Sequence, residues 1–266
     1  MKLGFFGCGN MGEAFLGGII KKGVCSEENI LVYDRAAERL QILQEKYAVA
    51  TTLNSNDLED CDVLFLGFKP QGLSTIGFTP KAGMIVISML VGKEIVSIEE
   101  KFPQTKIARI MPNVGLFVGK GMTGLFFNPE NTFTSEERET VRSLLTAGEK
   151  VLELEAEEQI DKLSTISGSG PAYFFRFAEA LQQSAEQLGF TPEQSELMVK
   201  QTLIGSAQLL QDNPNDSCAL WREKVTSPKG TTEQALRIFN ENDINALVQE
   251  AVDAAKKRSE ELSKEV

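Results

Sequence analysis

The residues "KLGFF" (2–6), followed directly by "GCGNMGEAFLGGIIKKG" (7–23), are the part of the sequence that decides the fold. The first stretch predicts a short buried strand, and the second joins a glycine-rich turn to an apolar helix. Gly7, Gly9 and Gly12 match the G-x-G-x-x-G pattern, whose glycines allow a tight turn and close approach of the backbone to a pyrophosphate. Because the pattern lies between a predicted strand and a predicted helix, it indicates a dinucleotide site.

A second apolar stretch, "ILVY" at 30–33, ends beside Asp34 and Arg35. Asp34 lies about twenty residues after Gly12, where a carboxylate in this arrangement binds the ribose hydroxyls of the adenosine. Such a carboxylate favours NADH, because it repels a 2′-phosphate. Arg35, with Arg39 one turn further on, would instead neutralise that phosphate and favour NADPH. The sequence leaves the two cofactors as alternatives.

Strands and helices alternate through the N-terminal half, which is typical of an α/β protein with a parallel, doubly wound sheet of Rossmann type. Ligands of such sheets bind at the carboxyl ends of the strands. Lys69, Ser88 and Asn113 follow such ends, so we expect them to share one site with Asp34 and Arg35. Further strands are predicted at 62–68, 84–88 and 106–111, and helical segments at 36–47, 71–76 and 94–101.

After residue 155 the apolar period changes from two to 3.6, which predicts helices without strands. The sequence therefore predicts a dinucleotide-binding Rossmann domain at 1–155 and an all-α domain for substrate binding and dimerisation at 156–266. Thr191 and Gln194 predict a capping box at one of the helix starts. The apolar faces of the helices favour packing against a second subunit, with a self-contained bundle as the alternative. Helices are expected at 171–188, from 191 to 210, and at 243–263.

The composition argues against several classes of function. A net charge of −11 speaks against nucleic acid or an anionic membrane as a partner. The chain has no histidine, which removes His-based hydrolysis, acid–base catalysis and zinc ligation, and we expect no metal. No apolar run is long enough to span a membrane. Four cysteines without metal-ligand spacing predict free thiols in a reducing cytoplasm: Cys8, Cys25, Cys61 and Cys218.

Two further segments, "SGSGPAYFF" (167–175) and "SPKGTT" (227–232), are rich in glycine and hydroxyl groups and lie at predicted helix starts. The free N–H groups and the dipole of a helix start favour an anion. In the second segment, Thr231 with Gln234 predicts a capping box. Capping leaves three neighbouring residues without a role: Ser227, Gly230 and Thr232.

Together these segments resemble the pyrroline-5-carboxylate reductase family. The resemblance implies reduction of the cyclic imine 1-pyrroline-5-carboxylate to L-proline with NADPH or NADH, the last step of proline biosynthesis. It also implies a homodimer formed through the helical domain, commonly assembled further into a decamer. The resemblance covers nearly the whole chain and rests on "GFFGCGNMGEA" (4–14), "KP" (69–70), "RIMPN" (109–113), "SGSGPAYFF" (167–175) and "SPKGTTEQAL" (227–236).

The resemblance also implies roles for the residues that match the family motifs. In this interpretation the Thr232 hydroxyl reaches the imine nitrogen and is the catalytic group, while the helix start receives the substrate carboxylate, in a site shared between subunits. This chemistry suits a protein without histidine, because a protonated imine accepts hydride once it is held against the nicotinamide. The substrate-binding set is Ser227, Gly230, Thr231 and Thr232. The cofactor-binding set is Gly7, Gly9, Asn10, Met11, Gly12, Lys69 and Asn113, the last two near the ribose and nicotinamide.

The chain departs from the family pattern at three places. The family usually has Gly where Lys229 stands, and Thr-Pro where Val114-Gly115 stand. It usually has Ala-Ala-Gly where Leu90-Val91-Gly92 follow the strand at 84–88. Lys229 would either strengthen anion binding or point to solvent. The bulkier Leu90 and Val91 lie where the nicotinamide is expected, which leaves a related imine substrate open.

Two alternatives share part of the pattern. A β-hydroxyacid dehydrogenase has the glycine turn and a helical second domain, but it depends on a catalytic Lys followed by an Asn on the same helix. The predicted helix at 171–188 contains neither residue. A non-catalytic nucleotide-binding protein would keep the glycine turn, and the departures at 90, 91 and 229 leave this interpretation open. Oxidation of NADPH or NADH in the presence of 1-pyrroline-5-carboxylate separates the three.

Overall fold

The computed structural model describes the backbone of residues 1–265 and, except at 74, 75, 149 and 262–265, their side chains. The chain forms two compact units, one of Met1–Pro171 with Ala255–Val266 and the other of Ala172–Ala254. The last strand ends at Glu153, before the border between the units. The domain division at residue 155 stays a prediction.

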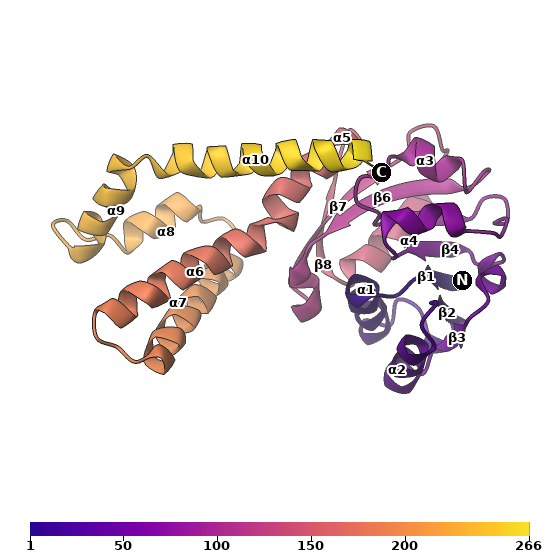
Figure 1. The fold of residues 1–266 in the computed structure, drawn as a ribbon, viewed down its shortest axis with the longest axis horizontal. Helices are drawn as coiled ribbons and strands as arrows, with labels where there is room; N and C mark the ends of the chain where they lie inside the picture. The colour runs from indigo at the N-terminus through magenta and orange to yellow at the C-terminus, as the bar shows by residue number, and fades with distance from the viewer. Residues whose placement is uncertain (266) are drawn as a thin grey trace. The chain divides into compact units, whose positions relative to one another are not determined.

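The first unit is built on one sheet of eight strands in the order β3-β2-β1-β4-β5-β6-β7-β8 (Figure 1). All neighbours pair in parallel except β6 and β7, which are antiparallel. The predicted doubly wound sheet of Rossmann type is confirmed, with the chain order reversing between β1 and β4, where such sheets bind ligands. The strands are β1 (Leu3–Phe6), β2 (Ile30–Tyr33), β3 (Ala50–Thr52), β4 (Val63–Leu66), β5 (Ile85–Ser88), β6 (Lys106–Pro112), β7 (Gly121–Phe127) and β8 (Glu149–Glu153).

Helices cover both faces of this sheet. One apolar layer joins the sheet to α1 and α4, and the other joins it to α3 and α5. Strands buried on both faces are continuous apolar runs, as in "VLFL" of β4, which is buried throughout. The helices are α1 (Asn10–Lys21), α2 (Ala37–Tyr47), α3 (Ile95–Glu99), α4 (Ser135–Thr146) and α5 (Glu158–Leu163).

Short helical turns complete the first unit. The helix predicted at 71–76 is a 3₁₀ turn, η3 (Pro70–Thr75), that begins one residue earlier, at the proline. A π-helical turn, η5 (Ser164–Gly168), follows α5 and is closed by the N–H of Ser169, which donates to Ser164 O at 2.8 Å. The other turns are η1 (Glu27–Asn29), η2 (Ser55–Leu58) and η4 (Val114–Val118).

Three strands and three helices were absent from the sequence prediction: β3, β7, β8, α4, α5 and, in the second unit, the helix Cys218–Lys224. β3 is three half-exposed or exposed residues long and therefore has no apolar run. β7 contains two glycines, and Leu163 of α5 packs close to one of them: a Cβ on Gly124 would lie 2.9 Å from the end of the Leu163 side chain. In β8, which pairs with β7, Glu149, Lys150 and Glu153 are charged, so the sequence shows no apolar alternation there.

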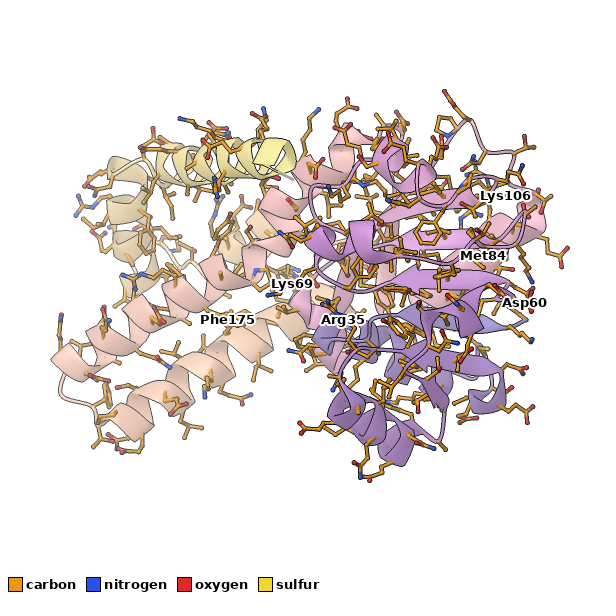
Figure 2. All side chains as sticks on the ribbon, turned by 45° about the vertical axis from the view of Figure 1, so that its right-hand side comes forward. Arg35, Asp60, Lys69, Met84, Lys106 and Phe175 are labelled. Carbon is orange, nitrogen blue, oxygen red and sulfur yellow. The ribbon has the colours of Figure 1, made fainter. Side chains whose placement is uncertain are left out.

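The second unit contains no strand among its residues, as predicted. The capping box of Thr191 and Gln194 is present at the start of α7. Ser195 and Val199 are the two buried residues of this unit, while large apolar side chains such as Phe174 (63% exposed), Phe175 (labelled in Figure 2) and Leu197 (70%) face outward. Its helices are α6 (Gly170–Gln187), α7 (Pro192–Asp212), α8 (Cys218–Lys224), α9 (Thr231–Glu241) and α10 (Ile244–Glu265), the first and last of which extend into the other unit.

Among the described residues no helix combines the length and the apolar character needed to cross a membrane. Cys8, Cys25 and Cys61 are buried free thiols, and Cys218 is an exposed one.

Candidate active site

The glycine turn connects β1 to α1 at the carboxyl edge of the sheet. Gly7 has a φ of +78°, and its N–H donates to Tyr33 O at the end of β2 at 2.8 Å. A Cβ on Gly7 would lie 2.9 Å from Phe68 Cβ, and a Cβ on Gly67 would lie 2.6 Å from Gly7 O. The turns after β1 and β4 are therefore packed against each other so closely that both need glycine.

Gly9 is different, because a Cβ at this position would meet no protein atom within 4 Å. Gly9 is the N-cap of α1, and no side chain accepts from the first N–H groups of this helix. Asn10 is exposed, Met11 is half-buried and packs on the core, and Gly12 is buried with its missing Cβ 3.4 Å from Cys8 Sγ. The packing of the fold does not require glycine at position 9. Glycine there instead suits a ligand that lies against the backbone.

Asp34 uses both carboxylate oxygens on the backbone. Its Oδ2 accepts from the N–H of Cys8 at 3.2 Å, and its Oδ1 accepts from the N–H of Ala36 at 3.1 Å. The side chain thus fastens the glycine turn to the end of β2. Burial raises the pKa of the adjacent Cys8 thiol to about 12, against the attraction of Arg39, so the thiol is protonated and unreactive.

Arg39 is also committed within the protein. Its Nε donates to Cys8 O at 2.8 Å, and its Nη2 forms an ion pair with Glu13 of α1. Arg35 is exposed, and within the described part of the chain it forms no hydrogen bond or ion pair. Of the two arginines that the sequence places after β2, Arg35 is the one free to meet a ligand.

Glu13 is the acceptor that joins α1 to α2. Burial by itself raises the pKa of this carboxyl, but hydrogen bonds from Lys46, Arg39 and Tyr47 outweigh burial and hold the pKa below its usual value. Lys46 Nζ donates at 2.8 Å and the Tyr47 hydroxyl at 3.1 Å. These contacts fix the direction in which α2 leaves β2, and with it the place of Arg35.

Two further predicted site residues follow β4 and β6. Lys69 is exposed at the start of η3 and forms no ion pair among the described residues. Figure 2 shows Arg35 and Lys69 on one side of the first unit, while Asp60, Met84 and Lys106, which precede or begin strands, lie on the opposite side. The structure therefore brings Arg35 and Lys69 to the carboxyl edge, as the strand directions predict.

Asn113 is at the same edge, but its amide is fully used within the protein. Oδ1 accepts from the N–H groups of Gly115 at 3.1 Å and Met122 at 3.2 Å. Nδ2 donates to Ser167 O at 3.2 Å and to Ser167 Oγ at 3.1 Å. Asn113 thus ties the end of β6 to η4, β7 and the π-helical turn η5.

In the second unit, "SPKG" forms a tight turn before α9. The N–H of Gly230 donates to Ser227 O at 3.0 Å, and Lys229 has a φ of +59°. Proline second and a left-handed residue third are the features of a type II turn, whose third position normally holds glycine. The left-handed conformation of Lys229 is therefore strained, because its side chain crowds the backbone there. A Cβ on Gly230 would lie 2.9 Å from Ser227 O, a backbone atom of the same turn, so glycine is favoured at that position.

The predicted capping box of Thr231 and Gln234 is wrong. The N-cap of α9 is Gly230, which has no side-chain cap, and Thr231 is already the first helical residue. The turn places the helix start one residue earlier than the sequence suggests, and Glu233 accordingly reaches back to accept from the N–H of Lys229 at 2.8 Å. Thr231 is exposed and Thr232 is half-buried in the first turn of the helix.

Comparison with known proteins identifies the family. Residues 157–262 match the family described as "Pyrroline-5-carboxylate reductase dimerisation", and residues 2–92 match "NADP oxidoreductase coenzyme F420-dependent". The pyrroline-5-carboxylate reductase of Pasteurella multocida is 35% identical over 98% of this chain and 97% of its own. That of Pseudomonas aeruginosa is 33% identical over 100% of this chain and 98% of its own. The chain belongs to the pyrroline-5-carboxylate reductase family.

Solved structures agree with this assignment. A pyrroline-5-carboxylate reductase from Coxiella burnetii is similar with a TM-score of 0.90 and 34% identity, covering 98% of each chain. The Plasmodium falciparum pyrroline carboxylate reductase with NADP bound has a TM-score of 0.79 and 26% identity, covering 99% of this chain and 98% of its own. The protein is an oxidoreductase that converts 1-pyrroline-5-carboxylate to L-proline, the last step of proline biosynthesis.

Family membership explains the uncovered apolar side chains of this reductase. The matched dimerisation domain contains all of α6 to α9, whose large apolar residues face outward. Exposed apolar area of this kind in a single chain marks a protein interface. The matched dimerisation domain and this exposed apolar surface therefore support oligomerisation.

Sequence reasoning missed two residues of the reductase that lie on strands of the sheet or directly after one. Gly67 was not singled out, although its close approach to Gly7 was implied by glycine at the end of a buried strand. Arg109 lies within "RIMPN", where the sequence assigned it no role, and it is the largest fully buried side chain among those that the structure describes. A charged residue inside an apolar strand was the signal that pointed to it.

Proposed function

We propose that this reductase is NAD(P)H-dependent and prefers NADPH, bound along the carboxyl edge of the sheet in the first unit. The preference for NADPH rests on a difference in hydrogen bonding between Asp34 and Arg35. Asp34 spends its carboxylate on two backbone N–H groups, whereas Arg35 is free and exposed. A free guanidinium at this position suits the 2′-phosphate of NADPH. The match to an NADP oxidoreductase family and the NADP in the Plasmodium falciparum enzyme support the same choice.

The residues of the glycine turn fit a dinucleotide. The empty space beside Gly9 leaves room for a pyrophosphate against the backbone, and the uncapped N–H groups of α1 are donors for its oxygens. We assign this contact to Gly7, Gly9, Asn10, Met11 and Gly12. Lys69 supplies a positive charge toward the ribose and nicotinamide half, and Asn113 shapes that part of the site through its bonds to the protein. When bound, the nicotinamide supplies the hydride.

The substrate is proposed to bind at the start of α9. The first N–H groups of α9 have no side-chain cap, so they are available to a carboxylate, and Ser227 and Gly230 shape the turn beside them. The Thr232 hydroxyl accepts a hydrogen bond from the protonated imine nitrogen and holds that proton in place during reduction, with Thr231 at its side. Lys229, immediately before the helix, adds positive charge near the substrate carboxylate.

The assembly proposed is a homodimer that completes the substrate site, with a decamer as its further association, in the cytoplasm. The support is the exposed apolar surface of the second unit together with the matched dimerisation domain. In this proposal the second unit supplies the hydroxyl groups and helix N–H groups that bind the substrate, and the first unit binds the dinucleotide. The domain division at residue 155 separates these two roles.

The test follows the oxidation of NADPH and of NADH with 1-pyrroline-5-carboxylate by the wild type, Arg35→Ala and the matched control Arg39→Lys. A charge-assisted hydrogen bond contributes roughly 1.5–3 kcal/mol, so Arg35→Ala should raise the KM for NADPH roughly tenfold or more. The KM for NADH should change little. Arg39→Lys keeps a charge beside Glu13 and should affect both cofactors alike. Equal effects of Arg35→Ala on the two cofactors would remove the assignment.

A further inference from the structure

Arg109 is a buried charge in an apolar layer. It lies in the middle of β6 and is 1% exposed, with Ser88 of β5 and Phe126 of β7 as its neighbours across the sheet. Ile107 and Met111, two residues away on either side, belong to the apolar layer between the sheet and α3 and α5. A guanidinium in such a place loses its hydration, so it persists only if an acid and good hydrogen bonds compensate.

The compensating acid is Glu157, which precedes α5. Arg109 Nη1 donates to Glu157 Oε1 at 2.7 Å, and the same oxygen accepts from the N–H of Ile95 at 2.8 Å. Ile95 is the first residue of α3, a helix without a side-chain cap from its own N-cap residue. Arg109 Nη2 lies 3.6 Å from Asp161 Oδ1. Arg109 therefore holds the start of α3 through Glu157.

This contact fixes one end of a segment at the carboxyl edge. Residues 89–94 connect β5 to α3, and their other end is held by Ser88 Oγ, which accepts from the N–H of Leu90 at 3.3 Å. Between the two ends the backbone turns at Gly92, which has a φ of +72°, and Val91 is 47% exposed. The segment lies at the end of β5, between the ends of β4 and β6, from which Lys69 and Asn113 extend.

Glu157 is itself held in a fixed place. The helix that it precedes continues into η5, and Asn113 binds Ser167 near the end of that turn. Arg109 on β6 and Asn113, the residue that follows this strand, thus fasten the beginning and the end of the segment 157–167. Because segment 157–167 is bound at both ends to β6 and the residue after it, Glu157 keeps a fixed position from which it binds the start of α3.

We propose that Arg109 is a positioning residue for the dinucleotide. Acting through Glu157, it keeps residues 89–94 in the conformation that contacts the nicotinamide half of the cofactor. This inference rests on the proposed function, in which the dinucleotide lies along the carboxyl edge. Without the ion pair of Arg109 and Glu157, segment 89–94 would have to become ordered when the cofactor binds. That entropic cost would weaken the binding of the cofactor rather than that of the substrate.

The experiment compares Arg109→Met, Glu157→Ala and Glu157→Gln with the control Glu158→Gln, an exposed neighbour whose ion pair with Lys162 spans 3.8 Å. Titration calorimetry measures the Kd for NADPH, and amide hydrogen exchange follows the Ile95 N–H in the protein without cofactor. Arg109→Met and Glu157→Ala should each raise the Kd about tenfold, as expected for a charge-assisted bond, and speed exchange at Ile95. Glu157→Gln keeps an oxygen for Ile95 and should have a smaller effect. Glu158→Gln should match the wild type.

The double variant Arg109→Met with Glu157→Ala should be no weaker in binding than the worse single variant, because both act through one contact. If Arg109→Met does not fold, Glu157→Ala carries the same test, since Glu157 is half-buried and Asp161, 3.6 Å from Arg109 Nη2, remains beside the guanidinium. Folded variants with a lowered Tm but an unchanged Kd and unchanged exchange at Ile95 would overturn the proposal. A wild type that binds neither NADPH nor NADH would instead overturn the proposed function.

Discussion

Replacing Gly9 by alanine separates the requirements of the fold from those of the cofactor. An added Cβ at Gly9 meets no protein atom within 4 Å, and the backbone there has φ −69° and ψ −167°, which alanine adopts without strain. Replacing glycine at an N-cap lowers the free energy of unfolding by a few tenths of a kcal/mol or somewhat more. Alanine also reduces the conformational entropy of the unfolded chain, which raises the free energy of unfolding by about 0.4–1 kcal/mol. The free energy of unfolding should therefore change by less than about 1 kcal/mol.

Cofactor binding should respond far more strongly to Gly9→Ala. The new methyl group occupies the space beside the first turn of α1, where the proposed pyrophosphate contacts backbone N–H groups. Displacing one charge-assisted hydrogen bond costs roughly 1.5–3 kcal/mol, which corresponds to roughly a 10- to 150-fold rise in the Kd for NADPH. Titration calorimetry measures the Kd, and urea denaturation measures the free energy of unfolding.

Gly67→Ala is the contrasting variant. Its Cβ would lie 2.6 Å from Gly7 O, a backbone atom that cannot rotate away, so we expect a loss of about 1–3 kcal/mol in the free energy of unfolding. If Gly9→Ala binds NADPH as tightly as the wild type, the pyrophosphate is not beside this turn. If Gly9→Ala unfolds as easily as Gly67→Ala, the reasoning from open space is refuted.

Two further predictions concern the substrate and the pH dependence of stability. Thr232→Ala should leave NADPH binding unchanged and lower kcat/KM roughly ten- to a hundredfold. Thr231 is exposed and is not the N-cap, so Thr231→Ala should change the free energy of unfolding by about 0.5 kcal/mol or less. Steady-state kinetics that fail to distinguish the two variants would place the substrate elsewhere. Because the pKa of Glu13 is lowered from 4.5 in the folded protein, the stability it contributes is present above that value and lost as the pH falls through the folded pKa. The stability difference between the wild type and Glu13→Gln should accordingly shrink in urea titrations below pH 4.5, and a difference independent of pH would contradict this.

Much of the fold follows from local sequence pattern. The glycine turn, the strand that precedes it and the alternation of strands and helices up to β6 depend on residues near one another in the chain. Turn chemistry and the periods of apolar residues act over a few positions, so they are readable without the fold. β7 and β8 lacked such a signal, because glycine in one strand and charge in the other replaced the apolar alternation.

Two helix starts with the same sequence spacing gave one correct and one wrong prediction of a capping box. The capping box of Thr191 and Gln194 is confirmed, and the equally spaced pair Thr231 and Gln234 is not a capping box. The difference is the turn before α9, where Lys229 adopts a left-handed backbone and moves the N-cap to Gly230. Spacing alone cannot register a backbone conformation that the preceding proline turn imposes.

The sequence by itself determined the architecture, the family resemblance and the edge of the sheet at which the polar residues meet. The tertiary structure decided which of them remain free to act. Asp34, Arg39 and Asn113 bind backbone groups and half-buried side chains, whereas Arg35 and Lys69 are exposed and form no ion pair among the described residues. The reason is that a side chain's hydrogen-bond partners come from distant parts of the chain, as with Arg109 and Glu157, which are joined across 48 residues of sequence. Periodicity reports which face a residue occupies, but only packing reports what it meets there.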